Sequence, residues 1–221
     1  MSLSVTKKFY YTSQMKILPK IIPVFPLSGV IYFPKTNLPL NIFEQRYLDL
    51  VNDCLKKDRL MGMIQSKNNN EVYDVGCLGK INEYEKTNDG RILLNLSGLV
   101  RFNIKNEIKN SKKYREFKVD YSKFSLDMQN RENLMSQDEL SYFTQKAKKF
   151  FNKNGIMLNW NEFKKLDQSQ QINTLSMIAP VSNGEKQKLL ESVTEKEKTK
   201  NLLDIVEFYL YDSSNEKITI Q

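Results

Sequence analysis

The sequence predicts an α+β fold in which a β-rich N-terminal half, wrapped around one helix, leads into an α-helical C-terminal bundle. From Ile21 to about Tyr121, short apolar stretches alternate with turn signals, which is typical of strands. From Ser136 onward, apolar residues recur at helical spacing behind capping residues. The expected division has four parts: a flexible tail over 1–16, a β-rich domain over 17–125, a helical domain over 126–212 and a C-terminal tail over 213–221.

Composition indicates a folded protein of a reducing compartment. Of the 221 residues, 40% are apolar and 11% aromatic, which is enough to build a core. Cys54 and Cys77 are the only cysteines and form no CxxC motif, so the pattern favours the cytoplasm over a disulfide-stabilised secreted fold. No run approaches the ~20 apolar residues of a membrane span, and no membrane contact is expected.

The strand candidates follow one another along the first half. They are IIPVFPL (21–27), VIYF (30–33), LMGMIQS (60–66), VGCLGKINEYE (75–85), RILLNLSGLVRFNIK (91–105) and YREFKVDYSKF (114–124). The turn Asn88-Asp89-Gly90 between the fourth and fifth stretches favours a β-hairpin. Prolines in the early stretches indicate edge positions or strand ends.

One helix is expected to interrupt these strands, from about Phe43 to Lys57. Apolar residues recur there with a period close to one helical turn. The predicted buried face consists of Phe43, Tyr47, Val51, Cys54 and Leu55.

The junction NIFEQRYLDL, where this helix begins, carries charged residues. Asn41 and Glu44 have the three-residue spacing of a capping box, so Asn41 is predicted to cap the helix. Arg46 is expected within reach of Asp49 at i+3 but not of Glu44. The charges therefore predict a helix start and not a catalytic pair, with Gln45 and Arg46 on the exposed side.

Capping signals divide the second half into helices. The expected start signals are, in chain order, the capping box from Ser136 to Glu139, then Asn159, Ser169, Asn183, and the capping box from Thr194 to Glu197. Gly155 and Pro180 are expected to end the first and third of these helices. The last capping box opens a long amphipathic helix.

The chemistry missing from the chain argues against an enzyme. There is no histidine, which removes Ser-His-Asp and Cys-His catalysis and imidazole metal sites. No GxxxxGK[ST] or GxGxxG pattern is present to bind a nucleotide. Both cysteines lie in apolar surroundings and are predicted to pack in the core. We therefore predict no catalytic residue, no cofactor and no metal site.

Positive charge is concentrated in the first half. Residues 1–125 carry 21 basic and 12 acidic side chains, a net charge of +9, whereas residues 126–221 carry 13 and 14, a net charge of −1. The basic stretch Lys105–Lys118 is the best electrostatic candidate for a partner site, although a solvated hairpin loop is the favoured interpretation. Its candidate contact residues are Lys109, Lys112, Lys113 and Arg115.

Arginine is rare in this lysine-rich chain and marks positions where lysine would not serve. Its planar fork of five donors suits partly buried or bidentate contacts. Arg46, Arg59, Arg91 and Arg101 all lie in apolar surroundings. The favoured role is hydrogen bonding that holds the β half together, and ligand binding is the alternative.

Several of these segments carry a family resemblance. The block IPVFPLSGVIYFPKTNLPLNIFEQRYLDLVNDCLKKDRLMGMI, followed by VGCLGKI, DGRILLNLSGLVRFNI and GEKQKLLESVTEKEKTKNLL, resembles the Lon protease N-terminal domain in its stand-alone bacterial form. The resemblance extends from about Ile17 to Leu210, and one departure is Lys198 or Lys200 where such domains often have arginine. The motif residues are Phe25, Pro26, Leu27, Phe33, Pro34, Phe43, Tyr47, Arg91, Gly98, Arg101 and Phe102.

The resemblance implies a PUA-like pseudo-barrel followed by a helical bundle, and a role in capturing unfolded or tagged polypeptides. The chain ends at Gln221 without ATPase or protease modules, so we expect an adaptor or holdase, with a protease or chaperone as a possible partner. Glu44, Gln45 and Arg46 are further contact candidates. Two alternatives stay open. PUA-like barrels often bind RNA, although no aromatic-plus-arginine stacking motif is visible, and the terminal helix could instead serve assembly with one fixed partner.

Overall fold

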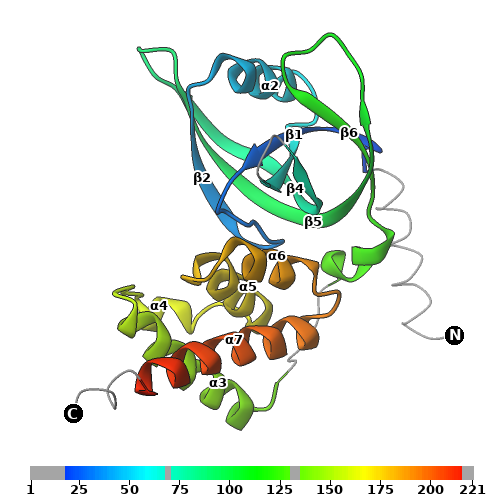
Figure 1. The fold of residues 1–221 in the computed structure, drawn as a ribbon. Helices are drawn as coiled ribbons and strands as arrows, with labels where there is room; N and C mark the ends of the chain where they lie inside the picture. Colours follow the sequence, from blue (N-terminus) through cyan, green and yellow to red (C-terminus); the bar gives the residue numbers. More distant parts are fainter. Residues whose placement is uncertain (1–17, 68–70, 130–134, 216–221) are drawn as a thin grey trace, which may run out of the picture. The chain divides into compact units, whose positions relative to one another are not determined.

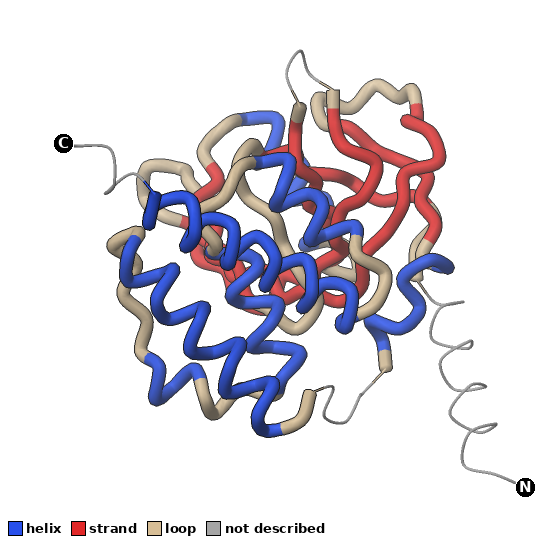
Figure 2. The backbone as a smooth tube through the Cα atoms, turned by 60° about the horizontal axis from the view of Figure 1, so that its bottom comes forward, coloured by secondary structure: helices blue, strands red, loops and turns tan. Residues whose placement is uncertain are grey.

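The computed structural model describes residues 18–67, 71–129 and 135–215. The chain divides into two compact units, Met1–Asn130 and Arg131–Gln221. Strands belong to the first unit and the long helices to the second, which confirms the predicted α+β order (Figure 2). The predicted domain boundary between 125 and 126 lies within a 3-10 helix of the first unit. The predicted tail over 1–16 and most of the tail over 213–221 lie outside the described residues.

Over its described residues, 18–67 and 71–129, the first unit is a curled six-stranded sheet with one α-helix and one 3-10 helix (Figure 1). Its elements are β1 (Ile21–Leu27), β2 (Asn37–Ile42), α2 (Gln45–Leu55), β3 (Leu60–Ser66), β4 (Val72–Lys86), β5 (Ile92–Ile108), β6 (Arg115–Asp120) and the 3-10 helix η1 (Ser122–Met128). The strand order is β2-β5-β4-β3-β1-β6, and β6 also pairs with β5. Strands β1 and β3 to β6 therefore close into a ring, to which β2 is added along β5. Only the β1–β3 pairing is parallel.

One edge of β5 is shared by three partners. Residues 92–97 pair with β2, and residues 103–108 pair with β6. Between these two sectors, the backbone N–H of Arg101 donates to Oδ2 of Asp127 in η1 at 3.0 Å. The Arg101 side chain, 1% exposed, also forms a fork with the Asp127 carboxylate at 2.9 and 2.7 Å. Its guanidinium lies 4.4 Å from the centroid of the Phe124 ring. Asp127 thus takes the place of a strand partner along β5, between Ser97, where the pairing with β2 stops, and Asn103, where the pairing with β6 starts.

The predicted VIYF strand is wrong, because this segment is a buried irregular connection. Tyr32 and Phe33 are at most 1% exposed, yet neither belongs to a strand. The connection lies against β5 at Gly98, whose carbonyl accepts from the Lys35 N–H and whose N–H donates to the Thr36 carbonyl. A Cβ at Gly98 would lie 2.0 Å from the carbonyl oxygen of Phe33, so only glycine fits. Two motifs of the family resemblance, Phe33-Pro34 and the segment beginning at Gly98, therefore meet in space.

The start of α2 differs from its prediction. Strand β2, which the sequence patterns did not single out, continues to Ile42, and Asn41 lies opposite Leu93 in the sheet. Asn41 is consequently no cap. The N-cap is Glu44, with φ −73° and ψ 132° and no capping hydrogen bond from its side chain. Phe43 lies in the connection between strand and helix and is 66% exposed, so the prediction that it faces the core is also wrong.

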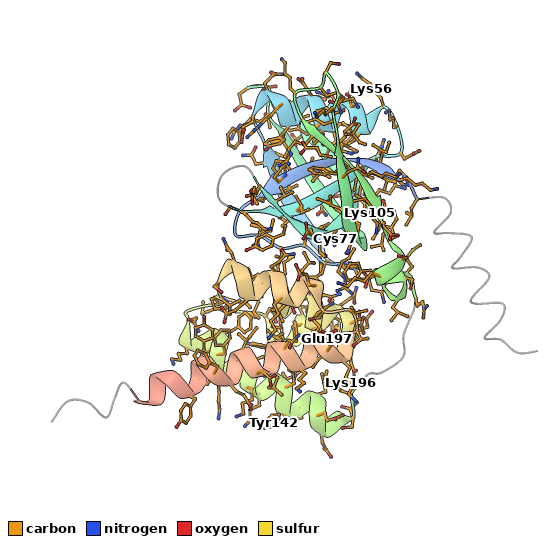
Figure 3. All side chains as sticks on the ribbon, turned by 45° about the vertical axis from the view of Figure 1, so that its right-hand side comes forward. Lys56, Cys77, Lys105, Tyr142, Lys196 and Glu197 are labelled. Carbon is orange, nitrogen blue, oxygen red and sulfur yellow. The ribbon has the colours of Figure 1, made fainter. Side chains whose placement is uncertain are left out.

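The rest of the predicted buried face of α2 is largely confirmed. Tyr47, Val51 and Cys54 are buried, whereas Leu55 is only half-buried. Helix α2 contacts β1 and β3, and it lies at the top of the first unit in Figure 1. The Cys54 thiol is 3% exposed, and burial raises its pKa to about 12. Cys77 is fully buried within the sheet (Figure 3), as expected for a core thiol.

The predicted hairpin between β4 and β5 is confirmed. The two strands pair antiparallel up to Lys86 and Ile92, on either side of the turn. Gly90 has a φ of +87°, a conformation that a side chain disfavours. Asp89 and Arg91 form an exposed ion pair within the turn at 2.7 Å.

The second unit is built of helices around a core of their apolar faces. They are α3 (Gln137–Lys153), α4 (Trp160–Phe163), α5 (Gln168–Ile178), α6 (Asn183–Glu191) and α7 (Glu195–Asn215). The core includes Phe143, Ala147, Phe150, Phe151, Phe163, Ile172, Leu175, Leu189, Leu190, Leu202 and Val206. Among the residues that the structure describes, no helix has the length and apolarity needed to cross a membrane.

Capping at most of these helices follows local signals. Ser136 forms the predicted capping box with Glu139, and Asn159 caps α4. The predicted cap at Ser169 is wrong, because Asp167 caps α5 in a box with Gln170. Ser169 instead lies within the helix.

The last helix is tied to α5 by polar contacts. The capping hydrogen bond predicted at Thr194 is present, since the Thr194 hydroxyl accepts from the Glu197 N–H at 3.1 Å. The Ser169 hydroxyl donates to Glu195. Lys198, 1% exposed, donates from Nζ to Oδ1 of Asn173 at 2.6 Å. Of Lys198 and Lys200, the two lysines at which the sequence was expected to depart from the family it resembles, Lys198 is therefore the buried one.

Candidate functional site

Two predicted contact regions that are far apart in the sequence meet in one groove of the first unit. The start of α2 contributes Arg46, and the β5–β6 hairpin contributes Lys113 and Arg115. The groove has a volume of about 460 Å³ and is lined by Pro26, Arg46, Tyr47, Ser66, Glu107, Lys113, Tyr114 and Arg115. We call it the hairpin groove. The other predicted contact residues, Glu44, Gln45, Lys109 and Lys112, are not part of its lining.

Two tyrosines form a firm base for the groove. Tyr47 and Tyr114 are 8% and 5% exposed. The Tyr47 ring packs edge-on against Phe25, with ring centroids 4.4 Å apart. The Tyr114 hydroxyl donates to Oδ2 of Asp53 at 2.8 Å. Burial raises the pKa of Tyr114 to about 12, and the hydrogen bond from Tyr114 lowers the pKa of Asp53. Burial also raises the pKa of Tyr47, so both phenols stay neutral at physiological pH.

Arg46 is held at the rim by Glu44, contrary to the prediction. Its Nε and Nη2 atoms lie 3.0 and 2.9 Å from Oε2 of Glu44. The two side chains meet because Glu44 has extended backbone geometry, whereas helical i,i+2 side chains would point apart. The Arg46 guanidinium also lies 4.5 Å from the centroid of the Tyr47 ring. Asp49, the predicted partner of Arg46, instead accepts from Gln45 at 2.8 Å.

Each cation of the hairpin groove has a carboxylate nearby. Arg115 forms a two-pronged pair with Glu107 at 2.8 and 2.7 Å, and this pairing lowers the pKa of Glu107. Lys113 lies 4.0 Å from Asp49. The groove therefore presents charged hydrogen-bonding groups without a strong net positive field.

Pairing also reduces the charge of the wider basic stretch Lys105–Lys118. Outside the groove, Lys112 pairs with Glu116 at 2.6 Å and Lys105 with Asp120 at 3.2 Å. Both acids belong to β6, whereas Lys105 lies in β5 and Lys112 lies in the connection between the two strands.

Sequence reasoning missed five members of the groove. Pro26 and Tyr47 were assigned only a structural role, and Ser66, Glu107 and Tyr114 were not singled out as contact residues. One signal was available for Glu107: it and Arg115 carry opposite charges and lie on either side of the predicted hairpin loop, where paired strands bring such residues together. No sequence pattern places Ser66 beside α2.

The groove is suited to binding and offers no evident reaction chemistry. Its charged groups are paired and its tyrosines are neutral. Across the described parts of the chain, no group of three or more acidic or thiol side chains is placed to hold a metal ion.

The sequence and the fold agree with a known class of binding domain. Residues 21–207 match the family model described as the ATP-dependent protease La (LON) substrate-binding domain. This match covers most of the chain, which therefore belongs to the Lon substrate-binding domain family. The match is to the substrate-binding domain and not to the protease domain, so catalysis is not indicated.

Individual relatives agree with this assignment. A Lon protease of Desulfosudis oleivorans is 32% identical over 100 residues, which are 42% of this chain and 12% of the relative. A Lon protease of Buchnera aphidicola is 22% identical over 194 residues, 84% of this chain and 24% of the relative. The chain thus spans a quarter or less of the length of these relatives.

Solved structures show the same fold. The Lon N-terminal domain protein from Xanthomonas campestris has a TM-score of 0.61 at 22% identity, covering 86% of this chain and 98% of that one. The N-terminal domain of a Mycobacterium avium complex Lon protease has a TM-score of 0.59 at 16% identity, covering 85% and 98%. At these identities the likeness concerns the fold alone.

Proposed function

We propose that this protein binds unfolded or exposed polypeptide segments in the hairpin groove. The observation that carries the proposal is the convergence of two arginines and two tyrosines, Arg46, Arg115, Tyr47 and Tyr114, on one groove. Arginine, tyrosine and tryptophan are the residues most enriched at the energetic centres of protein interfaces. Membership of a substrate-binding family supports the same role. The exposed ring of Phe43, next to the helix start that forms one wall, offers an apolar anchor.

The charge pattern of the groove favours a polypeptide over RNA. Binding of RNA gains much of its affinity from cations that neutralise phosphates and release counterions. The arginines and the lysine of the hairpin groove already face Glu44, Glu107 and Asp49. A polypeptide brings neutral amides and side chains of both signs, which such paired groups can accept without being separated.

The proposed role is non-enzymatic. The protein would hold a client as an adaptor or a holdase, and a protease or a chaperone would receive it. Two measurements test this role: suppression of aggregation of a chemically unfolded client, and in-cell cross-linking followed by identification of the captured proteins. If neither unfolded clients nor any cellular protein associates with the purified or tagged chain, the proposal is wrong.

The site is tested by paired substitutions. Arg46→Ala with Arg115→Ala should weaken client binding at least tenfold, because truncating an interface hot spot typically costs more than ~1 kcal/mol. Arg91→Ala is the matched control, since Arg91 is also a half-exposed arginine paired with a carboxylate in the same unit. Equal effects of the double variant and the control would contradict the assignment of the groove.

A second candidate function, assembly with one fixed partner, is favoured by the exposed aromatic side chains of α7. Phe208 and Tyr211 are 60% and 70% exposed and lie three residues apart, on one side of the helix. Large exposed aromatic groups mark many protein contact sites. Capture of a single stoichiometric protein, lost on Phe208→Ser with Tyr211→Ser, would favour this function over client binding.

A further inference from the structure

A second cavity of the first unit differs from the hairpin groove in its chemistry. Its volume is about 870 Å³, within the ~300–1,000 Å³ of typical ligand sites. Its lining consists of Leu18, Lys57, Asp58, Arg59, Leu60, Lys80, Leu99, Val100 and Met128. We call it the Arg59 cavity. It lies where the turn after α2 meets β3, β4 and β5, and Lys56 marks the neighbouring end of α2 in Figure 3.

The backbone of Arg59 is held in an unfavourable conformation. Its φ is +60°, in the left-handed region that glycine or asparagine normally occupies after a helix. The Arg59 N–H donates to the Cys54 carbonyl at 3.1 Å, and the Arg59 carbonyl accepts from the Ile81 N–H at 2.8 Å. These bonds fix the turn whichever residue occupies it. An arginine at a glycine-type position therefore points to a role for its side chain.

The cations of the Arg59 cavity have no carboxylate partner. Lys57, Arg59 and Lys80 form no ion pair with any residue that the structure describes, and Asp58 is the one acid in the lining. All three basic residues are exposed. This differs from the hairpin groove, where every cation has a carboxylate within 4.0 Å. The Arg59 guanidinium lies 5.9 Å from the centroid of the Tyr84 ring, a contact that leaves its charge without a carboxylate. An incoming carboxylate would therefore meet positive charge that no acidic side chain neutralises.

Apolar side chains lie beside these cations. Leu99 is 37% exposed although it belongs to β5, and Leu18, Leu60 and Met128 are half-buried. None of the lining residues is aromatic, so the cavity offers no ring on which a nucleobase could stack. The surface therefore complements a ligand that has apolar and anionic groups side by side.

We infer that the Arg59 cavity binds polypeptide segments in which leucine-like side chains neighbour aspartate or glutamate. The inference rests on the proposed polypeptide-binding function and adds to the hairpin groove a second contact site with a sequence preference. The apolar side chain packs on Leu99 and Leu60, and the acidic side chain reaches the lysines and Arg59. Residues 1–17 of the chain itself carry Lys7, Lys8 and Lys16 and no acid, so their charge does not fit this cavity.

The probe is a short acetylated and amidated peptide that carries Leu-Glu pairs separated by glycine and serine, with a rhodamine label. Binding to the full chain is followed by fluorescence anisotropy at two salt concentrations. Replacing glutamate by glutamine, or leucine by serine, in the peptide should weaken binding by about tenfold, the scale of a few exposed charge contacts or one buried apolar side chain. A higher salt concentration should weaken the binding of the glutamate peptide and leave that of the glutamine peptide unchanged.

The protein variants locate the site. Lys57→Gln with Lys80→Gln should weaken binding of the glutamate peptide by about tenfold and leave the glutamine peptide unaffected. Lys67→Gln with Lys118→Gln is the matched control, because it removes two exposed lysines of the same unit that line neither cavity, and it should leave binding unchanged. Arg59→Gly should also weaken binding while the melting temperature stays equal or rises, since glycine suits the positive φ.

Three results would overturn the inference: equal binding of the glutamate and glutamine peptides, binding of the same peptide only when its C-terminal carboxylate is left free in place of the amide, or displacement of the peptide by a single-stranded RNA oligonucleotide. Aggregation suppression measured in parallel separates this failure from that of the proposed function. If the protein suppresses aggregation but binds the glutamate and glutamine peptides equally, the proposed polypeptide-binding function holds and the preference for acidic segments is wrong.

Discussion

Replacing Asp127 by alanine would leave the Arg101 guanidinium inside the first unit without its carboxylate. The Arg101 side chain is 1% exposed and that of Asp127 is 9% exposed. The carboxylate accepts from the Arg101 backbone N–H at 3.0 Å and from the side chain at 2.9 and 2.7 Å. All three bonds join β5 to η1, so the variant loses a connection between two elements together with the compensation of a buried charge.

The magnitude follows from which charge remains after its ion-pair partner is removed. Removing one partner of a buried ion pair typically costs ~3–5 kcal/mol. Asp127→Ala should be near the upper value, because the more deeply buried charge remains and the Arg101 N–H loses its acceptor. Arg101→Met should be near the lower value, because Asp127 keeps the backbone N–H and is slightly exposed. Arg101→Met with Asp127→Leu removes both charges and should cost less than either single change.

Urea denaturation followed by circular dichroism measures these differences. The only tryptophan, Trp160, lies in the second unit, so its fluorescence reports that unit separately. Arg91→Ala, at an exposed ion pair, should change the free energy of unfolding by no more than ~0.5 kcal/mol. If the double variant loses as much as the two single variants together, the two residues are not energetically coupled and the reasoning fails.

Three further predictions concern a helix cap, a thiol and an acid. Ser136→Ala should lower the free energy of unfolding by ~0.5–2 kcal/mol, since Ser136 forms a full capping box. Asn41→Ala should cost clearly less, and equal losses in urea melts would contradict the assignment of caps. Cys54, whose pKa burial raises to about 12, should not react with an aromatic disulfide reagent at neutral pH until urea unfolds the protein, and rapid reaction of the native thiol would refute its burial. The hydrogen bond from Tyr114 lowers the pKa of Asp53, so its stabilising effect is present above the unfolded pKa of ~3.9 and is lost as the pH falls through the folded value. Tyr114→Phe should therefore destabilise the protein near neutral pH, and the gap to the parent protein should narrow in acid. A gap of constant size across that range would argue against this linkage.

Local signals predicted those parts of the fold that local interactions determine. The turn at Gly90 and the capping box at Ser136 are each decided within four residues, and both predictions are correct. The prediction that Ser169 caps α5 also used a local capping signal, but it chose the wrong residue. Asp167, two residues earlier, has Gln170 at the spacing of a capping box, and an acid there also faces the positive end of the helix.

Nonlocal contacts explain the larger errors. The segment Asn37–Ile42 alternates apolar with polar or proline positions, but it is short and contains a proline, which sequence patterns disfavour within a strand. It becomes a strand through pairing with β5, fifty to sixty residues away. That pairing extends to Ile42, and it thereby displaces the helix start and exposes Phe43. The VIYF segment is apolar enough for a strand, but its neighbour at Gly98 accommodates it as a close-packed connection.

The candidate site was predictable in its parts and not in its assembly. Arg46 and the pair Lys113 and Arg115 were each identified from charge and context. Their meeting depends on the order of strands in the ring, which brings the β5–β6 hairpin beside the start of α2. The pairing that reduces their net charge, such as Arg115 with Glu107, likewise depends on strand register.

The division of one β5 edge among β2, Asp127 and β6 has a consequence for hydrogen exchange. Detachment of β2 would expose amides of residues 92–97 while the ring through β4 and β6 stays closed. Such an opening is local and requires less free energy than global unfolding. The amides of residues 103–108 should exchange only when the ring itself opens. The Arg101 amide should exchange when η1 detaches from β5, because its acceptor is Asp127 of η1. One continuous strand would then show three separate exchange rates along a single edge.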